Sequence, residues 1–415
     1  MIDSSSANAH SSKGGELSDE ENQLVPSALA ALRNWCKQAQ SNGKTLFDLS
    51  MINPDLAPSR EVLDRFIEAS LKPTTHRYSS ARGLRKLREA FAAKYRDAFQ
   101  VHLDSENEVC ITLGTKDATL QVLSLYRDKY STLLLPLPTY PAMYSAASLI
   151  GNFEIQFYEA DCTPSMLSSL KRMVEKHPRS LILLNCPGNP TGICPSIEDL
   201  KDIIQIARAY DCHIFNDFVY GEMGFETRPS SLLKACDGDY QGVLEVYSMS
   251  KAYSIPGWRV AGLVGCRELV ETVAIRKSHT DYGTFTPIQV GAAAGLRASG
   301  SFLSETVSRY AKRAKLVTTR LQDLNCHVEL PEAGASVWAK LPDSYHADAE
   351  SFVQTLVLEE GVVILPGVVF GVPYRRHFRI SLVQPELVLS ECLDRIKNVL
   401  GQERRPEGTY GYVAG

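Results

Sequence analysis

The segment VYSMSKAYSIPGWRVA, residues 246–261, joins two apolar runs through a short polar turn. The first run covers 243–247, and small hydroxyl residues and Lys251 follow it directly. A Pro-Gly turn and Arg259 come next, before the second apolar run at 260–264. Continuous apolar runs bounded by turn residues predict strands that are buried on both faces. Most lysines are solvated surface groups, but one that follows a buried strand among small residues can be desolvated and reactive.

The same alternation of apolar runs and helical patterns extends toward the N-terminus. Further strands are expected at 109–113, 132–136, 181–184 and 213–216, and helices at about 115–127, 140–150, 163–176 and 196–209. Buried strands separated by helices predict an α/β fold with a mostly parallel central sheet and helices on both faces.

After about residue 300 the pattern changes to a long helix and alternating strands, which predicts a smaller α+β domain. The expected division is a large domain at 74–300, a small domain at 23–73 plus 301–400, a disordered segment at 1–22 and a flexible tail at 401–415. The two ends are expected to lack order because they contain few large apolar side chains.

Composition excludes several classes of protein. The chain has 415 residues, 44% hydrophobic and 22% charged, and a net charge of −4, which are ordinary values for a globular protein. So small a charge argues against a general nucleic-acid or membrane-surface footprint. The N-terminus lacks the pattern of a signal peptide, and no apolar run is long enough to span a membrane.

The cysteines indicate a reducing compartment and no metal site. Ten are present, none in a C-x-x-C pair and none clustered with histidine at zinc-ligand spacing. Most lie in apolar runs, as small buried thiols do. We therefore expect a cytoplasmic protein without a bound metal.

Three further segments place polar residues where predicted strands end. In an open parallel sheet these ends form the ligand site. TLGTKDA at 112–118 joins a strand to a helix, whose first amides can bind phosphate. CPGNPTG at 186–192 follows the strand 181–184, although Asn-Pro near Gly is also a plain turn signal. HIFNDFVY at 213–220 places Asp217 at a strand end, where a helix N-cap is the alternative.

Taken in order, these segments resemble the aminotransferases of class I and II, the fold-type I enzymes that depend on pyridoxal 5′-phosphate (PLP). The resemblance covers roughly residues 45 to 400, and 248–261 is similar to the lysine signature of the family at every constrained position. It implies that Lys251 forms a Schiff base with PLP. The nearest subgroups are the alanine-forming transaminases, similar at HTDYGTFTP (279–287), and the LL-diaminopimelate aminotransferases.

The resemblance also implies the roles of other residues. Catalysis would fall to Lys251, Asp217 at the pyridinium nitrogen and Tyr220 at the phenolic oxygen. The remaining cofactor contacts would be the Thr115 and Lys116 amides, Ser248, Ser250 and Arg259 at the phosphate, Tyr140 on the ring and Asn189 at the phenolic oxygen. Asn189 would also contact the substrate. Arginine suits a phosphate because its donors form a planar fork.

Two more segments imply a substrate contact and a dimer. HFRIS at 377–381 is similar to a late strand of the family, where Arg379 would hold the substrate α-carboxylate; an ordinary ion pair is the alternative. HRYSSARGLRKLR at 76–88 is similar to a segment whose tyrosine, here Tyr78, reaches the phosphate of the neighbouring subunit. A homodimer with shared active sites follows. The basic residues of this segment favour a solvated helix face over nucleic-acid binding.

One position departs from the family pattern. Ile52 stands where the family has glycine, close to the substrate, and its branched β-carbon is expected to hold the backbone away. Ile52 is therefore a candidate substrate contact that affects specificity. The first hypothesis is transfer of an amino group between an α-amino acid and a 2-oxo acid. The alternatives are elimination, replacement or carbon–carbon bond formation, as in enzymes resembling aminocyclopropane-carboxylate synthase, or a binding module without turnover.

Overall fold

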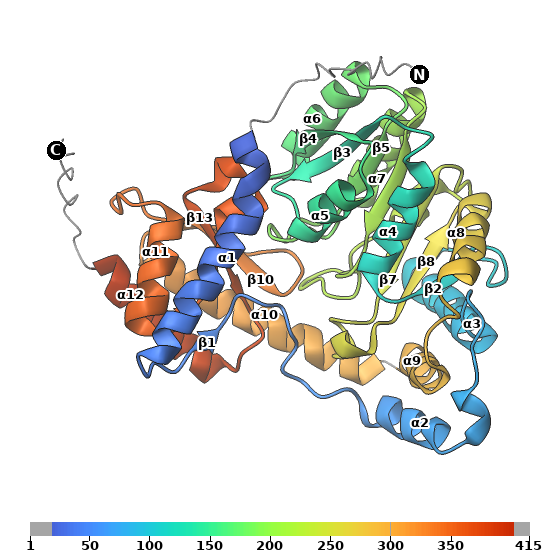
Figure 1. Ribbon diagram of the computed structural model, residues 1–415, viewed down its shortest axis with the longest axis horizontal. Coiled ribbons are helices and arrows are strands. Elements are labelled where there is room, and N and C mark those ends of the chain that lie inside the picture. Colours follow the sequence, from blue (N-terminus) through green and yellow to red (C-terminus); the bar gives the residue numbers. More distant parts are fainter. Residues whose placement is uncertain (1–18, 299, 402–415) are drawn as a thin grey trace, which may run out of the picture.

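The computed structural model describes the backbone of residues 19–298 and 300–401, and the side chains from residue 28 onward within those ranges. Two lobes lie side by side (Figure 1). The larger lobe is built on a seven-stranded sheet, and the smaller lobe on a four-stranded sheet. The predicted α/β class is confirmed.

The seven-stranded sheet has the order β2-β8-β7-β6-β5-β3-β4. Its strands are β2 (Val109–Thr112), β3 (Thr132–Leu137), β4 (Glu154–Glu159), β5 (Leu181–Leu184), β6 (His213–Asp217), β7 (Val243–Ser248) and β8 (Ala261–Gly265). Only β8 runs antiparallel to its neighbours, β2 and β7. The carboxyl ends of the other six strands therefore lie at one edge, where a ligand site is expected.

Helices cover both faces of this sheet. The helices of the larger lobe are α2 (Arg60–Ser70), α3 (Arg85–Lys94), α4 (Thr115–Tyr126), α5 (Pro141–Ile150), α6 (Thr163–Lys176), α7 (Ile197–Ala209), α8 (Arg267–Thr280) and α9 (Thr286–Ala298). Short helical turns are η1 (Pro73–His76), η2 (Tyr95–Phe99), η3 (Leu232–Cys236) and η4 (Pro256–Trp258).

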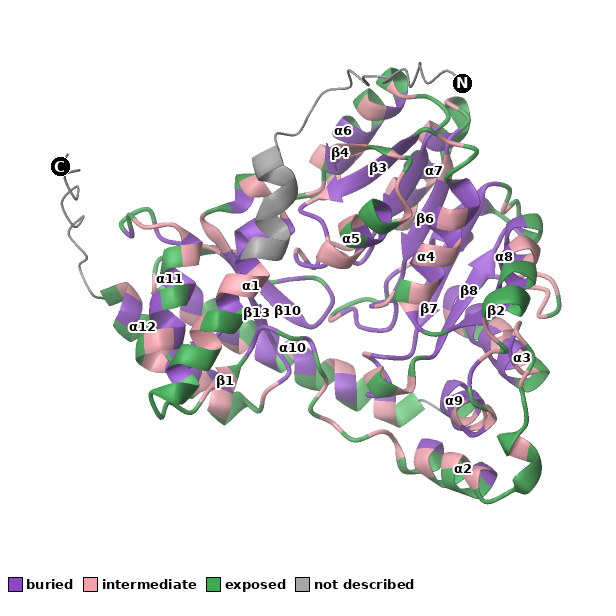
Figure 2. Ribbon diagram, viewed as in Figure 1, coloured by how far each residue is buried: buried purple, intermediate pink, exposed green. Residues whose placement is uncertain are grey.

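The strands are apolar on both sides because each face packs against helices. Leu133 and Leu135 of β3 lie in one core cluster with residues of α4, α5 and α8. Leu134 lies in the other cluster, with residues of α6 and α7. Alternate residues of a strand point to opposite faces, so a strand between two helical layers must be apolar throughout. Figure 2 shows the strands as the buried centre of the lobe.

The smaller lobe contains the antiparallel sheet β12-β13-β10-β9 and the parallel pair β1-β11. Its strands are β1 (Phe47–Asp48), β9 (His327–Val328), β10 (Ser336–Lys340), β11 (Val362–Val363), β12 (Leu365–Pro366) and β13 (His377–Ser381). Its helices are α1 (Asp19–Ser41), α10 (Gly300–Asp323), α11 (Ala349–Thr355) and α12 (Glu386–Gly401), with the turns η5 (Leu356–Glu360), η6 (Gly367–Phe370) and η7 (Val372–Tyr374).

The expected domain division needs correction at α2. We placed 23–73 in the small domain, but α2 packs on α9 of the larger lobe. Val62 lies against Gly291 and Gly295 of α9, where a β-carbon would overlap it, and the Phe66 ring lies 4.9 Å from that of Trp258. Within 23–73, α1 and β1 contact the smaller lobe as expected, and so does Asp55, which pairs with Arg313 of α10 at 2.8 Å.

Other boundaries also shift. Of the segment 1–22, expected to be disordered, residues 1–18 lie outside the described residues. Residues 19–22 are helical, because α1 begins at Asp19. Gly401 ends α12, and the rest of the expected tail at 402–415 lies outside the described residues. Strand β4 (Glu154–Glu159), with its mixed burial, was not predicted. No helix among the described residues is long and apolar enough to cross a membrane.

Candidate active site

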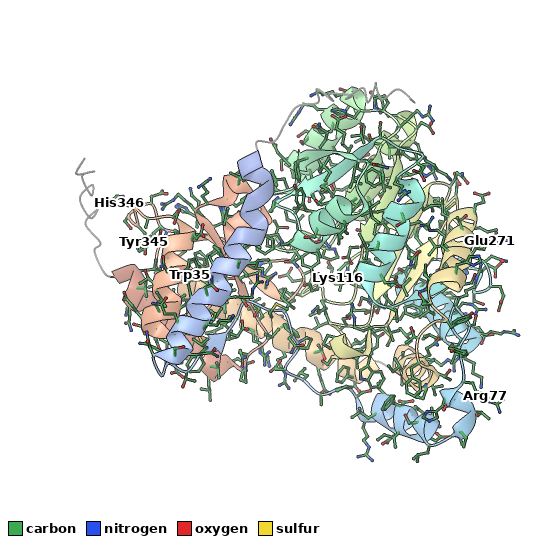
Figure 3. All side chains as sticks on the ribbon, viewed as in Figure 1. Trp35, Arg77, Lys116, Glu271, Tyr345 and His346 are labelled. Carbon is green, nitrogen blue, oxygen red and sulfur yellow. The ribbon has the colours of Figure 1, made fainter. Side chains whose placement is uncertain are left out.

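A cavity of about 820 Å³ lies between the two lobes, at the carboxyl ends of the parallel strands. Every residue predicted for the site, with the single exception of Tyr78, lines this cavity: Ile52, Thr115, Lys116, Tyr140, Asn189, Asp217, Tyr220, Ser248, Ser250, Lys251, Arg259 and Arg379. Lys116, labelled in Figure 3, marks the start of α4 between the lobes. Segments far apart in the sequence thus meet at one place.

Lys251 lies just beyond β7, and its surroundings favour a neutral amine. Burial lowers the pKa of Lys251 to about 8, helped by the positive charges of Arg379 and Arg259 and opposed by Asp217. Its amine donates a hydrogen bond to the carbonyl oxygen of Ile52. A neutral amine near pH 8 is a usable nucleophile and proton carrier, whereas an ordinary lysine is not.

Ile52 places its backbone next to Lys251. The carbonyl of Ile52 reaches the Lys251 amine, and the residue is buried. Ile52 is absent from the described non-glycine residues with positive φ, so a branched residue adopts its backbone conformation without strain. The expectation that Ile52 holds the backbone away from the substrate stays a prediction.

Asp217 ends β6 and has an unused acceptor. Its Oδ1 is buried and has no hydrogen-bond partner in the described part of the chain. Burial raises the pKa of Asp217 to about 7, although the Val219 amide and the charge of Lys251 lower it. Buried carboxylates are costly unless they are paired, so this atom requires a donor that the chain itself does not supply.

A second group of residues forms a cup suited to phosphate. Gly114 precedes α4 with φ +84°, and a β-carbon at this position would overlap the Arg259 guanidinium. The amides that begin α4 therefore lie next to a cation, which suits an anion. Ser248 Oγ accepts a hydrogen bond from the Ser250 amide at 3.1 Å and lies 3.0 Å from the Ser250 hydroxyl. Both hydroxyls line the same cavity.

Arg379 enters the cavity from β13 of the smaller lobe. Its Nη1 donates to Asn189 Oδ1 at 2.9 Å, and its Nη2 donates to the Ser50 carbonyl. Its Nε is buried without a partner in the described residues, and it forms none of the ion pairs found there. The alternative of an ordinary ion pair is therefore not supported.

Two tyrosines also lie in the cavity. Burial is the main cause that raises the pKa of both Tyr140 and Tyr220, so both phenols remain protonated near neutral pH. A protonated phenol can donate a hydrogen bond to an anionic oxygen.

Tyr78 does not reach the cavity of its own chain. Its side chain is 88% exposed, and Figure 3 places the adjacent Arg77 at the edge of the larger lobe, well away from Lys116. Its ring lies 4.8 Å from that of Tyr282, which is also exposed. An exposed aromatic pair on a protein surface often marks an interaction site.

Asn185 was missed in the sequence. Its Nδ2 donates to the Asp217 carbonyl at 3.1 Å, and its Oδ1 accepts from the Asn189 amide at 2.7 Å. Asn185 therefore fixes two predicted site residues relative to each other. The signal that could have found it is a polar residue directly after the apolar strand β5.

Glu245 of β7 and Asn216 of β6 form a second group that the sequence analysis missed, inside the central sheet. Glu245 is fully buried on β7 and accepts hydrogen bonds from Tyr95, Ser231, Leu232 and Asn216. Asn216 in turn accepts from the amide of Cys186 at 3.1 Å. A polar residue inside an otherwise apolar strand was the available signal, because such a group must be satisfied by partners.

The residues present fit PLP. The orphaned Asp217 oxygen matches a protonated ring nitrogen that donates a hydrogen bond, and the cup at Gly114 and Arg259 matches a phosphate. Lys251 lies in the same cavity, as an imine-forming amine must. The described residues contain no group of three or more His, Cys, Asp or Glu side chains able to hold a metal.

Comparison with known proteins identifies the class. The family model for aminotransferase class I and II matches residues 44–396, so the chain belongs to this family and is a PLP-dependent transferase, as predicted. It is 29% identical to the glutamate-pyruvate aminotransferase AlaC of Escherichia coli, over 86% of this chain and 88% of AlaC. It is also 29% identical to an LL-diaminopimelate aminotransferase of Moorella thermoacetica, over 92% and 97% of the two chains.

A solved structure agrees with these relatives. The substrate-bound BacF structure from Bacillus subtilis has 27% identity and a TM-score of 0.80, covering 93% of this chain and 96% of that one. The named relatives are aminotransferases, which supports transamination over elimination or carbon–carbon bond formation.

Proposed function

We propose that this chain binds PLP in the cavity between its lobes and transfers an amino group between an α-amino acid and a 2-oxo acid. The observation that carries the proposal is the buried, unpaired oxygen of Asp217 in the same cavity as the depressed-pKa amine of Lys251. When bound, PLP accepts the electrons of the substrate bond that breaks at Cα.

Each side chain has a task in this proposal. Lys251 holds the cofactor and, once released, moves a proton at its amine between two carbon atoms. Asp217 keeps a proton at the ring nitrogen, because its buried carboxylate is stabilised by a cation. Tyr220 and Asn189 donate hydrogen bonds to the phenolic oxygen. The Thr115 and Lys116 amides, Ser248, Ser250 and Arg259 hold the phosphate, and Tyr140 covers the ring.

Arg379 is proposed to bind the α-carboxylate that both substrates share. Its guanidinium is buried and faces the cavity with an unpaired Nε, so a carboxylate can form a bidentate pair with it. The relatives named for glutamate-pyruvate and LL-diaminopimelate aminotransfer support acidic and small amino acids as the first donors to examine.

A donor screen tests the reaction. Purified protein with PLP is incubated with ¹⁵N-labelled amino acids and a second 2-oxo acid, and the products are analysed by mass spectrometry. Transamination predicts that the label appears in the new amino acid. Release of labelled ammonia or loss of a side-chain group without transfer would contradict the proposal and indicate elimination.

The rate of PLP uptake should depend on pH in a defined direction. The pKa of Lys251 is about 8, so about a tenth of the amines are neutral at pH 7, and the fraction rises about tenfold per unit below pH 8. Asp217, with a pKa of about 7, ionises over the same range and then attracts the cationic ring. We therefore expect the rate of PLP uptake to increase from pH 6 to 8 and to level off above pH 8. Stopped-flow absorbance measures this rate. Uptake independent of pH would contradict the assignment of Lys251.

We further propose a homodimer in which Tyr78 contacts the phosphate bound by the partner subunit. Tyr78, Tyr282 and Phe285 are 88%, 63% and 42% exposed and form an aromatic surface together with His76. Exposed aromatic residues are enriched at interfaces, because their burial there is favourable.

Mixed dimers test this arrangement. Tyr78→Phe removes a hydrogen bond to a charged group and should weaken PLP binding about tenfold or more. Lys251→Ala should be inactive. A mixture that exchanges subunits creates one site with Lys251 from one chain and Tyr78 from the other, so activity at low PLP should exceed that of either variant alone. No gain in an exchanging mixture would show that Tyr78 does not act across the interface.

We also propose a cytoplasmic location, supported by the ten free cysteines, of which most of the described ones are buried. Fractionation of cells that make the tagged protein tests this, and recovery in the membrane or secreted fraction would contradict it.

A further inference from the structure

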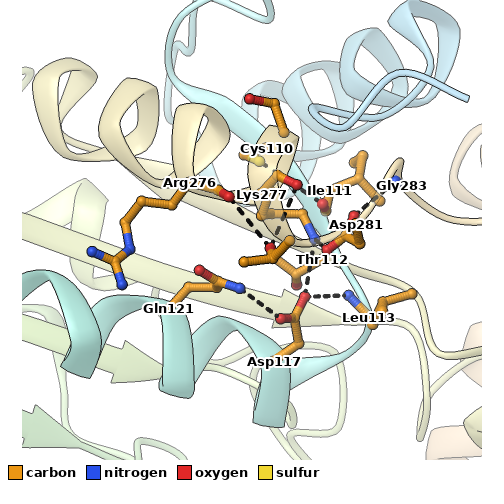
Figure 4. A network of polar contacts seen from close by, with 12 residues as sticks. Cys110, Ile111, Thr112, Leu113, Asp117, Gln121, Arg276, Lys277, Asp281 and Gly283 are labelled. Carbon is orange, nitrogen blue, oxygen red and sulfur yellow. Dashed lines mark hydrogen bonds and ion pairs between the residues drawn. The ribbon is translucent and has the colours of Figure 1, made fainter. Parts of the chain in front are cut away.

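Lys277 on α8 is a buried cation outside the cavity. Its side chain is 1% exposed, and its Nζ lies 2.7 Å from Asp281 Oδ2 and 3.2 Å from Asp117 Oδ2 (Figure 4). Burial acts to lower the pKa of Lys277, but its hydrogen bond with Asp281 and the charges of Asp117 and Asp281 raise it overall. Lys277 therefore remains charged and holds two carboxylates together.

The first carboxylate leads to the phosphate cup. Asp117 is the third residue of α4, and its Oδ2 also accepts a hydrogen bond from the Leu113 amide at 2.9 Å. Leu113 directly precedes Gly114, which contacts Arg259 and begins the run of amides at the start of α4. Lys277 thus fixes the carboxylate that fixes the backbone of the cup.

The second carboxylate leads to Tyr78. Asp281 Oδ1 accepts a hydrogen bond from the Gly283 amide at 2.7 Å. Gly283 has φ +79°, and a β-carbon there would overlap the carbonyl of Ser80, so the turn lies directly on the segment that carries Tyr78. Tyr282 in the same turn contacts the Tyr78 ring. Gln289 supports this segment separately, through Ser79 and Thr284.

We propose that Lys277 is a positioning residue for the cofactor phosphate, acting through Asp117 on the cup of its own subunit and through Asp281 on Tyr78. This inference rests on the proposed function, because it requires a phosphate-bearing cofactor in that cup. Among the described residues, the polar partners of Lys277 Nζ are Asp117 and Asp281, and neither of them lines the cavity, so we expect its effect to pass through these two carboxylates.

The phosphate itself provides the test. Lys277→Met keeps the length of the side chain and leaves Asp117 and Asp281 without their shared cation, so their mutual repulsion should displace the two segments. We expect the Kd for PLP, titrated into folded apo-protein, to rise about 10- to 100-fold. The Kd for pyridoxal, which lacks the phosphate, should change less than about threefold, because the ring contacts of Asp217 and Tyr220 are untouched.

Arg276→Met is the matched control. Arg276 is the preceding residue of α8, it is exposed, and its side chain points away from the network (Figure 4). The Arg276→Met substitution removes one positive charge from the same helix and should leave the Kd values for PLP and pyridoxal unchanged. If Lys277→Met does not fold, Asp117→Asn serves as a milder second variant. It should raise the Kd for PLP several-fold.

The outcomes separate the inference from the proposed function. Loss of PLP affinity with retained pyridoxal affinity supports the positioning role. Equal losses for both ligands, or a lowered melting temperature with both Kd values unchanged, would show that Lys277 is only structural and overturn the inference. Wild-type protein that binds neither ligand would instead overturn the proposed function.

Discussion

Lys251→Ala is expected to reduce kcat by at least a factor on the order of 10²–10⁴, the usual contribution of a positioned proton carrier. The cavity offers no replacement at the same place: among its lining residues the other lysines are Lys37 and Lys116, and both are exposed rather than buried beside Asp217. Steady-state amino-group transfer with saturating PLP measures this loss.

Lys201→Ala provides a control for this substitution. Lys201 is a half-exposed lysine of α7 that pairs with Glu198 at the surface, outside the cavity, and its loss should leave kcat unchanged. A Lys251→Ala protein that folds, binds PLP and turns over at the wild-type rate would remove Lys251 from the centre of the proposal.

Asp217→Asn is expected to have the second-largest effect. Losing one partner of a buried charge pair costs about 3 kcal/mol or more, which is on the order of a hundredfold or more in rate if the pair matters in the transition state. Asparagine has a similar size and cannot stabilise a cation at the ring nitrogen. kcat should therefore fall, while the structure of the strand β6 is retained.

The measurement is single-turnover rate against pH for wild-type and Asp217→Asn protein. The fall should persist at every pH between 6 and 9, because asparagine does not titrate. Asn185→Ala removes the hydrogen bond to the Asp217 carbonyl and should lower the rate in the same direction by a smaller factor. A wild-type rate for Asp217→Asn would contradict the role assigned to the orphaned oxygen.

The sequence was most informative where apolar strands end in polar residues. Asp217 ends β6, Lys251 and Asn189 follow β7 and β5, and parallel pairing brings the ends of these strands to one edge. The apolar pattern predicts where the strands end, and the resemblance to the aminotransferases implied which polar residues at those ends form the site.

Packing partners were less accessible from the sequence. The amphipathic pattern of α2 shows that it buries one face but not that α9 offers the small residues Gly291 and Gly295 to receive it. The role of Lys277 likewise depends on Asp117, 160 residues away in the chain. Such contacts are set by the tertiary fold, which local patterns do not specify.

The most direct test of the central claim is to locate the covalent attachment of PLP. The purified protein is reduced with borohydride, digested and analysed by mass spectrometry. A single modified residue is expected, Lys251 in the peptide that follows β7, and none in the Lys251→Ala protein. Attachment at Lys116 or another lysine, or unmodified Lys251 in protein that transfers amino groups, would contradict it.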